Sequence, residues 1–388
     1  MLLGPTKEPT AMRQIEELHR RTSALVGYAR EIALDPEQKK PPVEMLVSDA
    51  AEAIGCSPAT IRAHDSILPT ERRQKTGSIE RRYYLDSDIR LLRQAIAPET
   101  FMPECRIITV ASYKGGVGKS TTAINMAHIL ASRGYRVLVI DTDPQFTTTQ
   151  VLLAAPFEID VPDEHTLAPL FFGDTTIYES QPWGTNWSNV DVIPANGAMN
   201  AADYMMRIRG ASYSLISEGV AHLHDDYDFI IYDTPPTLSA LSIASMVNAD
   251  AMICPLPPRM HDIASIDAFF AMLTPCWKKY GIDIPVIALL RTMVMQAPSK
   301  ALAKTDCHPA PEEREMIELM ERALGSHLMK AEVMHSKITK ELAKDFRSLS
   351  ETSTKNKTWK RAYKGYSDAC DELLNRLMKI EEIKTREQ

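Results

Sequence analysis

A glycine-rich segment, Lys114–Thr121, constrains the fold of this chain more than any other part of its sequence. It reads Lys-Gly-Gly-Val-Gly-Lys-Ser-Thr, follows the apolar run Ile107–Ala111 and precedes a helical pattern that extends to about Arg133. A strand, a glycine-rich loop and a helix in this order form the context of a phosphate-binding loop. Glycines let backbone amides close around phosphate oxygens, and the helix N-terminus adds positive charge. The segment therefore predicts a nucleotide site.

Each side chain of the loop has an expected role. Lys119 is expected to neutralise the β- and γ-phosphates, Ser120 to hold Mg²⁺ with its hydroxyl, and Thr121 to reach the α-phosphate. The residues expected to bind the nucleotide are Lys114, Gly115, Gly116, Val117, Gly118, Lys119, Ser120 and Thr121.

The rest of the chain predicts an α/β architecture. Short apolar runs separated by helical patterns indicate a doubly wound, mostly parallel sheet that is covered on both faces. These runs are 107–111, 137–140, 229–232, 251–255 and 286–290. A chain of 388 residues has room for two or three domains. We expect an N-terminal helix and linker (1–42), a small all-α domain (43–100), the P-loop domain (101–330) and a basic helical region packed on it (331–388).

The loop departs from the standard P-loop at one position, because Tyr113 stands where the first glycine belongs and Lys114 follows it. This variant resembles the ParA/MinD class of P-loop ATPases. The resemblance implies a homodimer with two ATP molecules between its subunits, in which Lys114 reaches the partner's nucleotide. It also implies ATP rather than GTP.

Two further segments match the same class. Asp141–Gln145 reads Asp-Thr-Asp-Pro-Gln, and Phe229–Asp233 is an apolar strand that ends in an aspartate. The resemblance implies that Asp143 orients or deprotonates the attacking water and that Asp141 lies near the Mg²⁺. Asp233 is expected to hold the Mg²⁺, usually through water. Phosphoryl transfer depends mainly on positioning and charge neutralisation, so the expected catalytic residues are Lys114, Lys119 and Asp143.

Residues 46–62 resemble a helix-turn-helix of the MerR-like winged type. In such a motif the second helix enters the major groove of DNA. The residues expected to bind DNA in this unit are Ser57, Thr60, Arg62 and His64 on the second helix and Arg81 and Arg82 in the wing. A helical pattern at residues 11–33 has the spacing of a short coiled coil. It predicts either pairing with a second chain or packing on its own domain.

The C-terminal region offers a second positive surface. Between Lys330 and Lys364 the chain has ten basic and four acidic side chains, although the net charge of the whole chain is −7. Lys340, Lys344 and Arg347 are expected to share one helix face and to bind non-specific DNA. A solvated helix face is the alternative interpretation.

Together these features predict a cytoplasmic, nucleoid-associated DNA-partition ATPase that needs ATP and Mg²⁺. The resemblance implies weak turnover that DNA and a ParB-type partner stimulate, and repression of its own operon through operator DNA. A nucleotide-controlled repressor and a division-site positioning ATPase remain alternatives. Six scattered cysteines without a CxxC pair argue against a zinc or iron–sulfur site. No membrane contact is expected, because no run of ~18 apolar residues exists and acidic residues accompany the apolar face of the last helix.

Overall fold

The computed structural model describes residues 14–22, 24, 40–69, 73–76, 79–153, 161–173, 175–209, 212–280, 282–295, 311–352 and 355–387. Residues 14–22 are helical, and Ile15 and Leu18 on this helix are exposed. Most of the remaining coiled-coil pattern lies outside the described residues, so pairing of this helix with a second chain stays a prediction.

An eight-stranded sheet forms the centre of the large domain, with the order β11-β10-β9-β4-β8-β5-β7-β6. Only the short edge strand β6 runs antiparallel to its neighbour. The strands are β4 (Arg106–Val110), β5 (Val137–Asp141), β6 (Trp183–Gly184), β7 (Val190–Ile193), β8 (Phe229–Asp233), β9 (Ala251–Leu256), β10 (Val286–Val294) and β11 (Leu328–Met334). The predicted doubly wound, mostly parallel sheet is confirmed.

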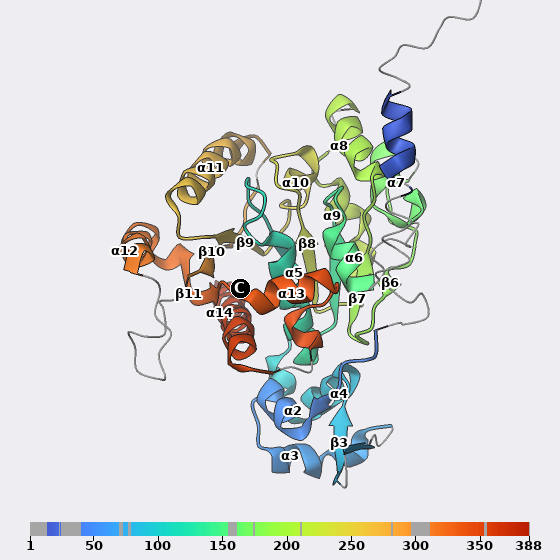
Figure 1. Ribbon diagram of the computed structural model, residues 1–388, viewed down its shortest axis with the longest axis vertical. Coiled ribbons are helices and arrows are strands. Elements are labelled where there is room, and N and C mark those ends of the chain that lie inside the picture. The colour runs from blue at the N-terminus through green and yellow to red at the C-terminus, as the bar shows by residue number, and fades with distance from the viewer. Residues whose placement is uncertain are drawn as a thin grey trace, which may run out of the picture.

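Helices cover both faces of this sheet (Figure 1). One face carries α5 (Lys119–Ser132), α6 (Thr147–Leu153), α13 (Lys337–Lys344) and α14 (Lys357–Glu387). The other face carries α7 (Ala168–Phe172), α8 (Ala198–Arg209), α9 (Leu215–Gly219), α10 (Ala240–Ala244), α11 (Met260–Tyr280) and α12 (Pro311–Leu324). The helix α5 is buried along nearly its whole length, which explains its apolar sequence.

The helical region predicted for residues 331–388 begins within a strand that the sequence did not indicate. The strand β11 crosses this boundary and pairs in parallel with β10. Its charged residues Lys330 and Glu332 alternate with buried apolar ones, as expected for an edge strand. The last helix packs on the core as expected, because Leu373 and Leu377 of α14 are buried. No helix within the described ranges is long and apolar enough to cross a membrane.

The N-terminal unit contains strands, so the prediction of an all-α domain is also wrong. Its elements are β1 (Met45–Leu46), α2 (Val47–Ile54), α3 (Pro58–Ala63), β2 (Arg73–Thr76), β3 (Ile79–Tyr84) and α4 (Asp86–Ile96). The strands form an antiparallel sheet in the order β1-β3-β2, and the hairpin β2–β3 lies where the wing was expected. A left-handed Gly55 ends α2, and the side chain of Ser57 caps α3.

Polar contacts fix this unit to the large domain. The guanidinium of Arg90 donates to the Asp228 carboxylate at 2.5 Å and to the Gly134 carbonyl at 3.1 Å. The Asp86 carboxylate accepts a hydrogen bond from the backbone amide of Asn189 at 2.6 Å. Asp228, Gly134 and Asn189 all lie just before strands, at the amino ends of the parallel sheet. The N-terminal unit therefore sits at the edge opposite the strand ends that precede the loops expected to bind the nucleotide (Figure 1).

The backbone of Gly134 lies close to the backbone of Arg90 in this interface. Its φ is +88°, and a Cβ atom there would lie 2.8 Å from the Cα of Arg90. We predict that Gly134→Ala lowers the free energy of unfolding by about 2 kcal/mol or more, since left-handed strain alone costs about 1 kcal/mol. Gly325→Ala is the control, because Gly325 has a φ of +53° and open space around it. Urea unfolding of both variants measures the difference, and equal losses would contradict a tight contact at Gly134.

Candidate nucleotide-binding site

The glycine-rich loop joins β4 to α5 at the carboxyl ends of the strands. Gly116 and Gly118 have φ values of +73° and +99°, which side chains with a Cβ adopt only with strain. A Cβ atom at Gly116 would meet no atom within 4 Å, so this side of the loop is open. The Thr292 hydroxyl donates to the Val117 carbonyl at 2.9 Å and braces the loop against β10. The loop is thus held open at the positive end of α5.

Two carboxylates are buried beside this loop, because Asp141 ends β5 and Asp233 ends the adjacent strand β8. Both oxygens of Asp141 accept hydrogen bonds from the protein. The amide of Asp143 donates to Oδ1 at 3.1 Å, and the amide and hydroxyl of Thr149 donate to Oδ2 at 2.9 and 2.8 Å. Burial and then the charge of Asp233 raise the pKa of Asp141 well above its usual value. Asp141 therefore shapes the turn that carries Asp143.

Only one carboxylate oxygen of Asp233 is hydrogen-bonded among the described residues. The Thr148 hydroxyl donates to Oδ2 at 2.7 Å, whereas the buried Oδ1 has no hydrogen-bond partner among the described residues. Burial raises the pKa of Asp233, and the nearby hydroxyls of Ser120 and Thr148 oppose that increase. An open carboxylate oxygen next to a hydroxyl is a donor set that suits Mg²⁺, which prefers oxygen ligands and keeps several waters. Ser120 and Asp233 thus fit a magnesium ion.

Asp143 lies in a tight turn at the same edge. Its Oδ1 accepts a hydrogen bond from the Gln145 amide at 2.9 Å, and its carbonyl accepts one from Phe146 at 2.8 Å. Phe146 takes a φ of +44° to close this turn. The Asp143 side chain is 8% exposed and lies close enough to Lys119 to raise the pKa of that lysine, although burial lowers it more. The structure therefore brings Lys119, Asp143 and Asp233 together.

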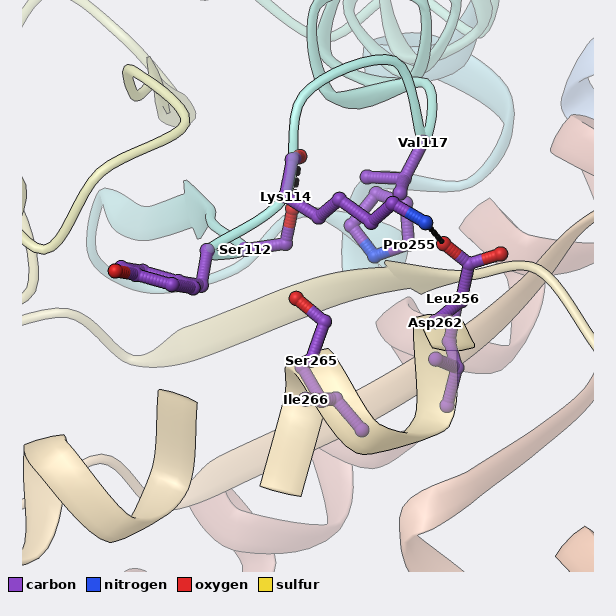
Figure 2. Close-up of a pocket in the computed structure, with 9 residues that line it drawn as sticks. Ser112, Lys114, Val117, Pro255, Leu256, Asp262, Ser265 and Ile266 are labelled. Carbon is purple, nitrogen blue, oxygen red and sulfur yellow. Dashed lines mark hydrogen bonds and ion pairs between the residues drawn. The ribbon is translucent and has the colours of Figure 1, made fainter. Parts of the chain in front are cut away.

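The two lysines of the loop have different partners. The ammonium of Lys119 is buried and donates to the Lys114 carbonyl at 3.1 Å, so it stays within the loop. Figure 2 shows that the Lys114 side chain extends away from the loop to Asp262 in the first turn of α11, where the Nζ–Oδ1 distance is 2.5 Å. Asp262 is itself 3% exposed. Asp262 is not among the residues predicted from the sequence, and nothing in its local pattern could have indicated this pairing.

The other predicted residues belong to the same loop and to the start of α5. A Cβ atom at Gly115 would lie 3.8 Å from Pro236, so the loop contacts the segment that follows β8. Ser120 and Thr121 form the half-buried start of α5, and the Thr121 carbonyl accepts a hydrogen bond from Asn125 at 2.7 Å. Thr148 and Thr149 are also absent from the residues predicted from the sequence. The run of three threonines after Gln145 and Phe146 was the available signal.

Comparisons with known proteins agree with this geometry. The family model of an AAA domain matches residues 105–284. SopA of Escherichia coli K12 is 26% identical over 374 residues, which cover 89% of this chain and 91% of SopA. A curated relative from Rhizobium rhizogenes is 30% identical over 246 residues, covering 58% of this chain and 60% of its own length. A solved structure named Partition Protein has a TM-score of 0.62 at 16% identity and covers 95% of this chain and 99% of its own. Together these similarities support a ParA-type partition ATPase.

Several of the solved structures with a similar fold contain a bound nucleotide. These solved proteins contain ATP, or magnesium together with ADP. The Rhizobium relative is longer than the matched region, since the chain spans 60% of its length.

The predicted DNA-binding residues lie outside the nucleotide site. On α3, Arg62 is exposed, and the Ser57 hydroxyl accepts a hydrogen bond from the Thr60 amide at 3.1 Å. His64 is bound at Nδ1 to the Thr60 carbonyl at 2.9 Å. Arg82 forms an ion pair with Asp65 at 2.8 Å, so its charge is partly neutralised. The side chain of Arg81 lies outside the described part of the structure.

The second predicted DNA surface lies on α13 and just beyond it. The prediction that all three basic residues share one helix face is wrong, because α13 ends at Lys344, before Arg347. Lys340, Lys344 and the following Arg347 are exposed, whereas Ile338 and Leu342 of the same segment are buried. Leu342 and Arg347 line a hollow between α13 and the helices α5 and α6. The exposed basic residues are thus separate from α3. The buried side of α13 faces α5, the helix that begins at the P-loop.

Thr149 provides a test of the buried carboxylate network, because its hydroxyl donates to Asp141 and accepts the Ala195 amide at 2.9 Å. We predict that Thr149→Val lowers the free energy of unfolding by about 1–3 kcal/mol, since it leaves buried polar groups without partners. Thr149→Ser keeps the hydroxyl and is expected to lose much less. Urea unfolding compares the two variants, and equal losses would show that side-chain shape matters rather than the hydrogen bonds.

Proposed function

We propose that this chain is a DNA-partition ATPase, which binds ATP and Mg²⁺ and uses slow hydrolysis to control its hold on DNA. One observation carries the proposal: Lys119, Asp143 and Asp233 converge at an open P-loop, and the helix that starts there supports the basic α13. Lys119 and the amides of the loop neutralise the phosphate charge. The ParA-type family and the ligands of its structural relatives support ATP as the nucleotide.

The catalytic step needs little besides these groups. Ser120 and the unpaired Oδ1 of Asp233 would hold Mg²⁺, and the ion would supply charge neutralisation at the phosphates. Asp143 orients the attacking water, and its backbone is held in place by Asp141. Because Asp141 uses both oxygens in hydrogen bonds to the protein, we assign it a positioning role and give the Mg²⁺ contact to Asp233.

Dimerisation is proposed to follow ATP binding. Lys114 forms an ion pair with Asp262 of its own chain, so it has to leave this partner before it can reach a nucleotide in a second subunit. The Lys114–Asp262 ion pair is therefore expected in the monomer and is broken in the dimer. Exchange of Asp262 for a phosphate would link dimer formation to ATP.

The DNA contacts are proposed to depend on this dimer. The hollow beside α13 has a volume of about 90 Å³ and is lined by Thr121 and Ile124 of α5 and by Thr147 of α6. Loose packing lets α13 adjust when the P-loop and the turn before α6 bind a nucleotide. A ParB-type partner is proposed to stimulate hydrolysis and to release non-specific DNA. The N-terminal unit is proposed to bind the operator and to repress the chain's own operon in the cytoplasm.

Removing the Asp143 carboxylate separates binding from hydrolysis. We predict that Asp143→Ala keeps ATP affinity within about threefold of the parent and lowers ATP turnover by about 100-fold, because only water positioning is lost. Lys119→Ala is the comparison and is expected to lose ATP binding itself. Fluorescent-ATP titration and phosphate release with DNA present measure both properties. A nucleotide-controlled repressor without hydrolysis would show no turnover in the parent, and that result would overturn the proposed function.

The basic face of α13 is tested separately. We predict that changing Lys340, Lys344 and Arg347 together to Ala weakens binding of the ATP form to any duplex. Each lost phosphate contact lowers the slope of log affinity against log salt by about 0.9. Arg62→Ala is the matched comparison and is expected to weaken operator binding alone. A triple variant with the parental salt slope on random duplex would show that α13 is only a solvated surface.

A further inference from the structure

The first turns of α14 form a compact positive surface. Residues 355–361 read Lys-Asn-Lys-Thr-Trp-Lys-Arg and thus contain four basic and no acidic side chains. Lys357 and Lys360 are exposed, whereas Trp359 is buried and donates a hydrogen bond to the Leu349 carbonyl at 2.6 Å. The buried tryptophan anchors the helix start, so the two lysines project from a fixed support. A surface with this charge and no exposed large apolar side chain suits a polyanion.

An ion pair connects this surface to the N-terminal unit. The ammonium of Lys355 lies 3.0 Å from the Asp49 carboxylate in the first turn of α2. In a helix-turn-helix, the first helix crosses the phosphate backbone while the second enters the groove. Here α2 is the first helix and α3 the second. The Lys355 contact therefore places the start of α14 beside the start of α2 and neutralises an acidic group there that would repel phosphates.

The interface between the N-terminal unit and the large domain fixes the position of that unit relative to α14. The Arg90–Asp228 ion pair, the Asp86–Asn189 hydrogen bond and the close approach at Gly134 hold α4 on the large domain. Two of these contacts involve buried or half-buried charges with good geometry, which resist displacement more than exposed pairs do. Lys357, Lys360 and the recognition helix α3 thus belong to one body.

We propose that Lys357 and Lys360 contact the phosphate backbone of DNA that flanks the segment read by α3. The operator-binding surface then continues from the N-terminal unit onto α14, and its footprint is longer than a helix-turn-helix alone requires. This inference rests on the proposed binding of operator DNA by the N-terminal unit. Phosphate contacts of this kind add affinity and fix the register of the protein, but they carry no sequence information.

The test compares a short operator duplex, which ends at the base pairs protected by α3, with one extended by about 10 base pairs, or one helical turn, on each side. Anisotropy titrations over a salt series use the full chain without nucleotide, so that ATP-dependent binding through α13 does not contribute. We expect Lys357→Ala with Lys360→Ala to lower affinity for the long duplex on the order of tenfold and its salt slope by about 1.8. Binding to the short duplex is expected to equal that of the parent.

Two controls keep the outcome clear. Lys278→Ala with Lys379→Ala removes the same charge from exposed positions on α11 and on the distal part of α14, and is expected to bind both duplexes like the parent. Lys357→Gln with Lys360→Gln keeps the aliphatic stems and is expected to reproduce the alanine result.

The outcomes separate this inference from the function on which it rests. Parental affinity and salt slope of both Lys357/Lys360 variants on the long duplex would overturn the inference, while sequence-specific binding to the short duplex would leave the proposed function intact. An equal loss of affinity for the two duplexes would also overturn the inference, because the two lysines would then contact the short duplex that α3 protects. A parent that prefers no duplex from its own promoter over random sequence would overturn both.

Discussion

Two carboxylates buried side by side at the ends of adjacent strands are the constraint on which the nucleotide site depends. Burial of Asp141 and Asp233 is unfavourable unless their oxygens are hydrogen-bonded, so the surrounding backbone has to supply donors. Thr148 and Thr149 at the start of α6 supply them, together with the amide of Asp143. These bonds fix the turn that carries Asp143 and leave one oxygen of Asp233 open. The requirement to satisfy buried charge thus shapes the site.

The helix α5 connects this site to the opposite end of the molecule. It starts with Lys119 at the P-loop, and the Arg133 carbonyl just after its last residue accepts a hydrogen bond from Arg93 of α4. A 14-residue α-helix is about 21 Å long. Along its length, Asn125 accepts the amide of Leu349, and His128 bonds the Ser348 hydroxyl at 2.7 Å. The buried helix α5 therefore contacts the nucleotide loop, the basic region of α13 and α14, and the N-terminal unit.

The sequence predicted the sheet and the P-loop well because both depend on local patterns. Apolar runs such as Phe229–Asp233 are buried on both faces, and the glycines of the loop are required by positive φ angles at Gly116 and Gly118. The sequence did not reveal β11, since Lys330 and Glu332 interrupt its apolar pattern at the sheet edge. The partner of Lys114 was also missed, because Asp262 is 148 residues away in the chain. Such pairs are set by topology, which local patterns do not encode.

In the proposed mechanism the nucleotide is a switch for binding to DNA, and one measurement tests this claim most directly. It is the affinity of the full chain for a random-sequence duplex with Mg²⁺ and ATP, with Mg²⁺ and ADP, and without nucleotide. Affinity is expected to be high only with ATP, because Lys114 then exchanges Asp262 for a partner's phosphate and the dimer presents two basic faces. Equal affinity under the three conditions would contradict the account, since the P-loop and the DNA surfaces would then act independently.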